Sequence, residues 1–496
     1  MLKRIAKVLG IVVAALALVG AGLYAAGMRI GLDGGGMPRL EFARSADDQA
    51  EAIARHRAEQ RADGNALPSP PDPVGPPVAE PAVAVPPPGA TTAHGATVTA
   101  PEPTPTPPYW TTFRGPAWDG HYRELPVSID WPRTQAAPVW KQPVGGGYAS
   151  FVADGRLAFT IEQRGSQEVV AAYEIATGRE LWTNSWNATF RERMGGDGPR
   201  ATPTWHEGRV YALGGAGELR AIDARSGRTV WRTDILEDAG ASNLQWGMAA
   251  SPLIVDDTVV VLPGGRGGQS VVAYDRRSGA RAWGALDDTA SYSSPMLVTL
   301  GGQRQILAFT AERLVGITPD AGQLLWEFPW KTQYGVNASQ PLLLGGDRVF
   351  ISTGYGTGAA SIQVSRGDDG RFTVRELWRT HRMKNQFTSS VLHDGFIYGL
   401  DEAILACIDA ETGELEWKGG RYGYGQVMLA GGQLVVLTEG GDLALVRATP
   451  DAHVERARFP ALDGKTWNHP AIAGGYLLIR NLQEMAAYDL RPRSVQ

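Results

Sequence analysis

The chain has 496 residues and a formal net charge of −5, and 62 of its residues are glycine. The length allows two or three ordinary domains or one large repeat fold, and the near balance of charge argues against a nucleic-acid partner. The glycine content, well above the usual ~7%, favours many tight turns and short strands. The single cysteine, Cys407, excludes an internal disulfide and a cysteine-based zinc site. The eight histidines show no pair at the helical spacing of metal ligands, so no metal site is predicted.

The first thirty residues have the pattern of a membrane anchor. Three basic residues, Lys3, Arg4 and Lys7, precede an uncharged run from Val8 to Met28. At ~1.5 Å per residue this run spans the hydrocarbon core of a bilayer, and its basic flank places the rest of the chain outside the cytoplasm. A cleaved signal peptide is the alternative, but the run is long for one and no clean A-x-A site follows. We predict a single-pass inner-membrane protein, anchored through residues 1–30, with its body in the periplasm.

Two connecting segments follow the anchor. Residues 31–65 are predicted to be a spacer with a short polar helix that Ser45 could cap, and this helix has little apolar surface with which to pack. Residues 66–108 are rich in proline, as in "PSPPDPVGPP", which favours a disordered, extended tether. The folded body is predicted over residues 109–496.

A repeated pattern dominates this body. Five times a small residue, a turn that ends in glycine and a tryptophan follow at fixed spacing, as in "AIDARSGRTVW" and "CIDAETGELEW". The glycine always precedes the tryptophan by four positions, which describes a hairpin whose glycine supplies a positive φ. The small residue across the hairpin is expected to leave room for a tryptophan from a neighbouring unit. Two more strand signals precede each hairpin, so each unit holds four strands over roughly 40 to 50 residues, the period of a propeller blade.

The outer-strand positions predict eight blades. The chain ends on a third strand, "AAYDL", so the missing outer strand is predicted to come from "APVWKQPV" around Trp140. Such a closure joins the first blade to the last and leaves no open edge. The fold class is therefore all-β: an eight-bladed β-propeller of four-stranded antiparallel blades closed by an N-terminal strand, preceded by a transmembrane helix and a Pro-rich tether. The tryptophans predicted to dock between blades are Trp182, Trp231, Trp283, Trp326, Trp378 and Trp417.

The repeat resembles the tryptophan-docking motif of the pyrroloquinoline-quinone (PQQ)-like β-propellers, and "YWTTFRGPAWDGHY" is similar to the opening motif of many bacterial members. The resemblance covers residues 109–496. Two units depart from it, since "ATPDAHVERARF" lacks the tryptophan and "SIQVSRGDDGRFTVRELW" has a longer hairpin. The resemblance implies two roles: quinoprotein alcohol dehydrogenases of this family hold PQQ and Ca²⁺ in the central funnel, whereas its assembly-factor members use the propeller as a docking platform without a cofactor. Fold alone does not choose between them.

The residues favour the non-catalytic, assembly-factor-like branch. The dehydrogenases cap PQQ with a disulfide between adjacent cysteines, whereas this chain has only Cys407, which is interpreted as a buried packing residue. No paired carboxylates precede the first strands to serve as base and Ca²⁺ ligand, with Asp197 the nearest candidate. We therefore predict a binding or assembly scaffold in the cell envelope, with no catalytic residue and no cofactor. The alternative is a dehydrogenase, dependent on PQQ with Ca²⁺, that oxidises an alcohol or sugar in the periplasm.

Residues just ahead of each first strand should gather at the mouth of the central channel. Polar and aromatic side chains recur there, which is typical of a binding site, although they could instead satisfy loop backbones and ordered water. Trp246 and Trp467 stand out because neither fits the docking spacing. The expected partners are the inner membrane, through the N-terminal helix, and an envelope protein or a small ligand in the channel. The candidate ligand-binding residues are Arg200, Gln245, Trp246, Tyr292, Asn337, Lys384, Asn385, Tyr424, Trp467 and Asn468, flanked by Asn243, Gln386 and His469.

Overall fold

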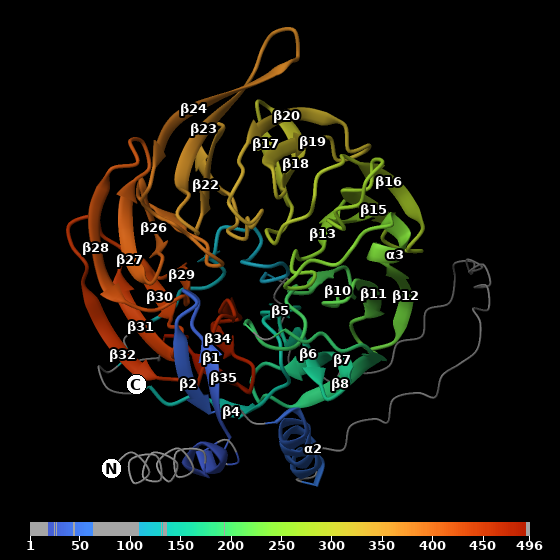
Figure 1. Ribbon diagram of the computed structural model, residues 1–496, viewed down its shortest axis with the longest axis vertical. Coiled ribbons are helices and arrows are strands. Elements are labelled where there is room, and N and C mark those ends of the chain that lie inside the picture. Colours follow the sequence, from blue (N-terminus) through green and yellow to red (C-terminus); the bar gives the residue numbers. More distant parts are fainter. Residues whose placement is uncertain are drawn as a thin grey trace, which may run out of the picture.

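Radial β-sheets form a closed ring around a central axis in the computed structural model (Figure 1). This confirms the all-β propeller of eight blades, each with four antiparallel strands. The predicted tether over 66–108 and most of the predicted anchor over 1–30 lie outside the described residues. The structure describes residues 18–23, 25, 27–42, 45–62, 109–129, 131, 136–192 and 194–492.

Blades 1 to 4 follow one another along the chain. Blade 1 consists of β5 (Val152–Ala153), β6 (Leu157–Arg164), β7 (Gln167–Glu174) and β8 (Glu180–Asn187). Blade 2 consists of β9 (Thr204–His206), β10 (Arg209–Leu213), β11 (Glu218–Asp223) and β12 (Thr229–Asp234), followed by the short helix α3 (Ile235–Ala239). Blade 3 consists of β13 (Leu253–Val255), β14 (Thr258–Val261), β15 (Val271–Asp275) and β16 (Arg281–Ala285). Blade 4 consists of β17 (Met296–Leu300), β18 (Gln303–Phe309), β19 (Arg313–Ile317) and β20 (Leu324–Pro329).

Blades 5 to 7 continue in the same way. Blade 5 consists of β21 (Leu342–Gly345), β22 (Arg348–Thr353), β23 (Gly358–Arg366) and β24 (Phe372–Thr380). Blade 6 consists of β25 (Val391–His393), β26 (Phe396–Asp401), β27 (Ile404–Asp409) and β28 (Leu415–Arg421). Blade 7 consists of β29 (Gln426–Ala430), β30 (Gln433–Leu437), β31 (Asp442–Arg447) and β32 (Glu455–Pro460), with the short β3 (His121–Tyr122) added in parallel to β29.

Blade 8 closes the ring with a strand from the start of the body. Its first three strands are β33 (Ala471–Ala473), β34 (Tyr476–Arg480) and β35 (Glu484–Asp489). The fourth is β4 (Trp140–Pro143), which pairs antiparallel with β35 from Glu484 opposite Pro143 to Ala487 opposite Trp140. The outer strand predicted around Trp140 is therefore the one that closes the propeller.

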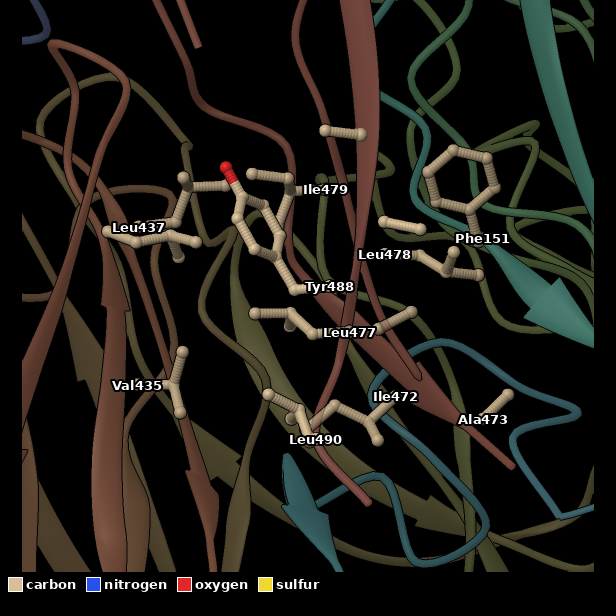
Figure 2. Packing of buried hydrophobic residues seen from close by; sticks show 14 of the residues in the cluster. Phe151, Val435, Leu437, Ile472, Ala473, Leu477, Leu478, Ile479, Tyr488 and Leu490 are labelled. Atoms are coloured by element: carbon tan, nitrogen blue, oxygen red, sulfur yellow. The ribbon is translucent and has the colours of Figure 1, made fainter. Parts of the chain in front are cut away.

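The inner strands of a blade are apolar at successive positions because both faces pack against neighbouring blades. In β34, Leu477 and Leu478 are both buried although their side chains point to opposite faces. Figure 2 shows Leu478 on the side of Phe151, which precedes blade 1, and Leu477 on the side of Val435 in blade 7. The core therefore lies between blades, all the way around the ring.

The indoles of the repeat reach across these interfaces. The Nε1 of Trp182 in blade 1 donates to the Ala224 carbonyl of blade 2 at 3.0 Å, and a Cβ at Gly227 would lie 2.7 Å from the same indole. The repeated glycine therefore serves a turn with positive φ and a close approach of the neighbour's ring. The role expected for the small residue is corrected, because Ala221 lies opposite Trp231 of its own blade. Equivalent indole-to-carbonyl bonds are made by Trp140, Trp231, Trp378 and Trp417.

Two indoles of the repeat differ. Trp283 lies against Gly322 of the next blade, but its Nε1 has no hydrogen-bond partner among the described residues. Trp326 donates instead to Gln305 of its own blade. The blade after Trp326 has the longer hairpin β23–β24, so the short glycine turn that lies against the indoles of Trp182, Trp231, Trp283 and Trp378 is missing there.

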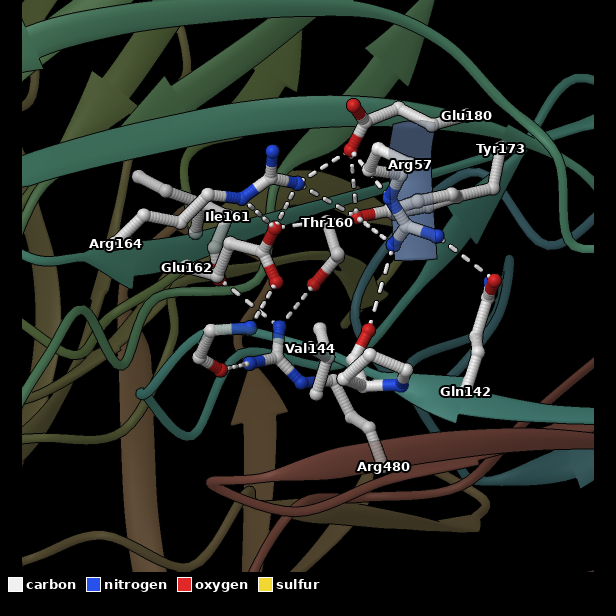
Figure 3. Close-up of polar contacts among 12 residues, drawn as sticks. Arg57, Gln142, Val144, Thr160, Ile161, Glu162, Arg164, Tyr173, Glu180 and Arg480 are labelled. Atoms are coloured by element: carbon white, nitrogen blue, oxygen red, sulfur yellow. Dashed lines mark hydrogen bonds and ion pairs between the residues drawn. The ribbon is translucent and has the colours of Figure 1, made fainter. Parts of the chain in front are cut away.

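The helix α2 (Ala46–Ala62) packs on the seam between blades 8 and 1, below the ring in the view of Figure 1. Arg57 is buried and donates to Gln142 of β4 at 2.8 Å, and it pairs with Glu180 of β8 at 3.2 Å (Figure 3). Gln49 donates to the carbonyl of Val144 at 2.7 Å. These hydrogen bonds are made by polar side chains, and Ile53 is the buried apolar residue of the helix. The absence of an apolar stripe in the sequence therefore did not indicate the contact.

A β-hairpin precedes this helix. Its strands β1 (Met28–Leu32) and β2 (Pro38–Phe42) pair antiparallel around the turn Asp33–Met37. In Figure 1 the hairpin lies over blades 7 and 8 with its turn toward the ring centre. Within the residues that the structure describes, no helix is long and apolar enough to cross a membrane.

Candidate functional site

The centre of the ring holds a cavity of about 720 Å³, a size typical of ligand sites. Each of the eight blades contributes lining residues from the segment that leads into its first strand. Aromatic side chains dominate this lining: Phe113, Tyr148, Trp246, Tyr292, Tyr334, Tyr355, Phe387, Tyr424 and Trp467. The topology thus brings together side chains that are far apart in the sequence.

Six of the ten candidate residues line the cavity, namely Arg200, Gln245, Trp246, Tyr292, Tyr424 and Trp467. The other four do not. Asn337, Asn385 and Asn468 are fully buried, and their amides donate to the carbonyls of Thr310, Leu400 and Gly147, respectively. Lys384 pairs with Glu402 at 3.0 Å. These four residues hold the loops from which the lining side chains project.

Arg200 is a fixed cation in the wall. Its guanidinium carbon lies 4.5 Å from the centre of the Phe190 ring, and its Nη2 donates to the Gly196 carbonyl at 2.6 Å. Burial lowers the pKa of Arg200, but an arginine so placed keeps its charge at neutral pH. A partly desolvated cation held against aromatic rings can attract an anionic or carbonyl group.

The aromatic rings form a connected wall. Trp467 stacks on Tyr148 with ring centres 5.2 Å apart, and the ring centre of Phe387 lies 4.6 Å from that of Trp467. Burial raises the pKa of Tyr292 and of Tyr424 to about 12, so both phenols remain protonated at neutral pH. The wall therefore offers apolar surface and hydroxyl donors, but no phenolate that could act as a base.

The opening segment of the body contributes Phe113 to the lining, and the next residue, Arg114, is buried. Arg114 donates to the Ser390 carbonyl at 2.6 Å, and burial lowers its pKa to about 10. Its Nη1 lies 3.1 Å from Nε2 of His469. Because the guanidinium can only donate, Nε2 accepts, and Nδ1 donates to the Pro470 carbonyl at 2.6 Å. His469 is thus neutral and has both ring nitrogens engaged.

Acid should destabilise the protein through His469. Burial, followed by the charge of Arg114, holds the pKa of His469 well below its usual range, so the unfolded chain binds a proton that the folded chain rejects. The stability is present above the unfolded pKa of ~6.5 and falls by about 1 kcal/mol between pH 6.5 and 5.5. Burial also lowers the pKa of His121, His206 and His453, which add to the loss. Urea denaturation at both pH values should therefore show the summed loss, and His469→Gln should reduce it by about 1 kcal/mol. The same loss in His469→Gln would contradict this assignment, and His381→Gln at an exposed site is the control.

Several lining residues were missed by the sequence interpretation. Tyr148 and Phe387 precede the first strands of blades 1 and 6, so the rule that found Trp246 also applied to them. Tyr355 and Glu402 follow the second strands of blades 5 and 6, a position that was not considered. Only the approach of these loops to the axis places them at the cavity.

Comparison with known families and proteins gives a consistent answer. Residues 166–419, just over half of the chain, match the model of a family described as "Outer membrane protein assembly factor BamB". The protein of that name from Bordetella pertussis is 21% identical over 60% of this chain and 72% of its own length. The one from Burkholderia pseudomallei is 24% identical over 72% of this chain and 88% of its own length.

A solved structure has a similar fold. A europium-containing methanol dehydrogenase matches with a TM-score of 0.55 over 75% of this chain and 89% of its own, at 12% sequence identity. At that identity the likeness concerns the fold alone.

The predicted location as a single-pass inner-membrane protein is wrong. The matched relatives are named outer membrane protein assembly factors. In the described part of the chain no helix is long and apolar enough to span a bilayer, and the strand β1 already begins at Met28, the last residue of the predicted apolar run.

Proposed function

The chain belongs to the family of the outer membrane protein assembly factor BamB, and from this premise we propose that it is a docking scaffold for the assembly of outer membrane proteins in a bacterial cell envelope. The observation that carries the proposal is the family match from blade 1 to blade 6. The relatives named for this role support it.

The chemistry of the cavity supports binding rather than turnover. General acid–base catalysis needs a group that exchanges a proton near neutral pH. The phenols of Tyr292 and Tyr424 have a raised pKa, and burial, followed by the charge of Arg114, holds the pKa of His469 well below its usual range. Glu402 is paired with Lys384. The wall is built to hold a partner group between aromatic rings and one fixed cation, Arg200.

The residues present do not fit PQQ with Ca²⁺, the cofactor pair that the fold family implies. Among the described residues there is no group of three or more His, Cys, Asp or Glu side chains that could hold a metal ion. Glu439 accepts hydrogen bonds from Trp467 Nε1 at 2.9 Å and from the Tyr424 backbone at 3.2 Å, so this carboxylate is already engaged. Cys407 is buried within β27.

Capture and cofactor binding together test the proposal. The tagged full-length chain, cross-linked in its native envelope, should retain components of the machinery that assembles outer membrane β-barrels. Loss of the gene should lower the amount of folded β-barrel protein in that membrane. Incubation with PQQ and Ca²⁺ should give no stoichiometric quinone absorbance.

Stoichiometric PQQ binding with dye-linked oxidation of an alcohol or a sugar would overturn the scaffold proposal and establish the dehydrogenase. The double variant Trp246→Ala, Trp467→Ala separates the cavity from the rest of the surface. Its capture of partners should fall at least ~10-fold if the cavity is the docking site, because a desolvated aromatic anchor can contribute about 2 kcal/mol or more. Unchanged capture would place docking on the outer face of the blades.

A further inference from the structure

The turn of the N-terminal hairpin lies in the mouth of the cavity. Leu32, Asp33 and Gly34 are among the residues that line it, and Gly34 is buried. One face of the hairpin's stem is exposed, since the cross-strand pair Ile30 and Leu40 remains 77% and 66% accessible. The buried end of the hairpin is its turn.

The channel binds this turn through its main chain. The Gly34 N–H donates to Glu439 Oε1 at 2.7 Å, and the Gly34 carbonyl accepts from Gln386 Nε2. Glu439 is oriented for this by Trp467, whose Nε1 donates to the same oxygen at 2.9 Å. The channel thus supplies an acceptor for the N–H and a donor for the carbonyl of the same residue. Proteins recognise a polypeptide backbone through such main-chain hydrogen bonds.

The wall also selects for glycine. A Cβ at Gly34 would overlap the ring of Tyr424, and one at Gly35 would lie 2.8 Å from the Tyr424 hydroxyl oxygen. The turn arrives preformed, because Asp33 Oδ1 accepts from the N–H of Gly35 at 3.0 Å and of Met37 at 2.8 Å. The ligand that fits is a tight turn in which an aspartate precedes glycine.

We propose that the mouth of the channel is a binding site for a glycine-containing polypeptide turn, and that the chain's own turn at Asp33–Met37 occupies it until a partner's turn of the same kind displaces it. The partner is a polypeptide, because the groups that bind address an amide N–H and a carbonyl of one residue. This deepens the docking function proposed above and rests on it for the existence of a partner.

The resident turn is suited to displacement. A two-stranded hairpin is marginally stable by itself, and here its cross-strand apolar pair, Ile30 and Leu40, remains exposed. Its advantage is its attachment to the same chain, which gives an effective concentration on the order of mM. Only molecules with an empty site can bind a partner. The apparent affinity for the partner is therefore lowered in proportion to the fraction of molecules whose site is empty.

Peptide binding to the full-length chain tests the inference. The probe is a fluorescein-labelled synthetic peptide with the sequence of residues 28–42, followed by fluorescence anisotropy. Gly34→Leu in the chain should evict the resident turn, since its side chain overlaps Tyr424, and should raise the affinity for the probe at least ~10-fold over the unaltered chain. Gly34→Ala is a second, milder eviction variant.

A matched change in the same turn serves as the control. Gly36 has a φ of +80° and no atom within 4 Å of an added Cβ, and asparagine tolerates such a φ best, so Gly36→Asn should leave the turn seated and the affinity low. A probe peptide that carries Gly34→Ala should bind the evicted chain at least ~10-fold more weakly, because its Cβ meets the Tyr424 ring. This comparison alters only the peptide and so does not depend on the folding of a protein variant.

The inference is overturned if the folded Gly34→Leu and Gly34→Ala chains do not bind the probe, if the unaltered chain binds it equally well, or if the Gly34→Ala peptide binds as tightly as the original. Capture of the assembly machinery is measured separately. If capture persists while the probe fails, the scaffold function stands and only the turn site falls.

Discussion

Replacing Trp231 by alanine should lower the free energy of unfolding by about 3–5 kcal/mol. The indole is 8% exposed, and its Nε1 donates to the Arg276 carbonyl of blade 3 at 3.0 Å. A Cβ at Gly279 would lie 2.8 Å from the ring, so the side chain fills the space between blades 2 and 3. Its removal leaves a cavity at an interface that cannot close without moving a whole blade.

Urea denaturation followed by far-UV circular dichroism measures this loss. Val230→Ala at the neighbouring exposed position is the control and should change the stability by less than about 0.5 kcal/mol. Gly279→Ala should be destabilising as well, because the added methyl group meets the Trp231 ring and the φ at this position is +75°. An unchanged midpoint in Trp231→Ala would mean that the indole does not join the blades.

Replacing Arg480, at the seam between blades 8 and 1, by methionine should lower the free energy of unfolding by about 3–5 kcal/mol. The Arg480 side chain is fully buried in this seam, and Figure 3 shows its guanidinium among groups from blade 1. It donates to Thr160 Oγ1 at 2.7 Å and to the carbonyl of Gly145 at 2.8 Å. The fully buried carboxylate of Glu162 lies beside it, so the substitution removes a neighbouring positive charge and leaves hydrogen-bond acceptors unpaired.

The pH dependence of Arg480→Met identifies the cause. Burial alone would raise the pKa of Glu162, but Arg164 and then Arg480 bring it below its ordinary value of 4.5. This carboxylate therefore contributes stability that is present above the unfolded pKa and is lost as the pH falls through the folded pKa. In Arg480→Met the folded pKa rises, so acid unfolding should begin at a higher pH than in the unaltered chain.

Denaturation curves from pH 3 to 7 would record that shift. Arg491→Met on the same blade is the matched control, because Arg491 forms an exposed pair with Asp489 that is worth at most about 1 kcal/mol. If Arg480→Met and Arg491→Met lose the same stability at every pH, the buried cluster does not hold the seam.

The ring could be predicted because each unit of its repeat consists of residues that lie close together in the sequence. The spacing from Gly227 to Trp231 describes a hairpin, and its recurrence sets the number of blades. The missing last strand predicted the closure by β4, since an open edge in blade 8 has to be paired. Such features depend on local chemistry and on counting, both of which a sequence contains.

The candidate site was predictable only in part. The rule that residues just ahead of each first strand lie at the channel mouth placed Trp246 and Trp467 at the cavity. The same rule treated every polar side chain alike. Asn337 and Asn468 follow the same rule, yet they turn away from the axis to bind loop carbonyls. The direction of a side chain depends on which backbone groups lie within reach, and spacing along the chain does not contain that information.

By itself, the sequence determined the propeller, its eight blades and its closing strand, because each follows from a periodic pattern of small, aromatic and glycine residues. Only the tertiary structure decided that a polar helix clasps the seam through Arg57, and that the turn at Gly34 enters the channel against Tyr424. Arg57 and Gln142 are 85 positions apart and are joined by a hydrogen bond, without an apolar pattern in the sequence that would indicate the contact. Gly34 and Tyr424 lie in segments at opposite ends of the chain. The physical reason is that a hydrophobic period repeats along the chain, whereas a polar contact is specific to two places that only the closed ring brings together.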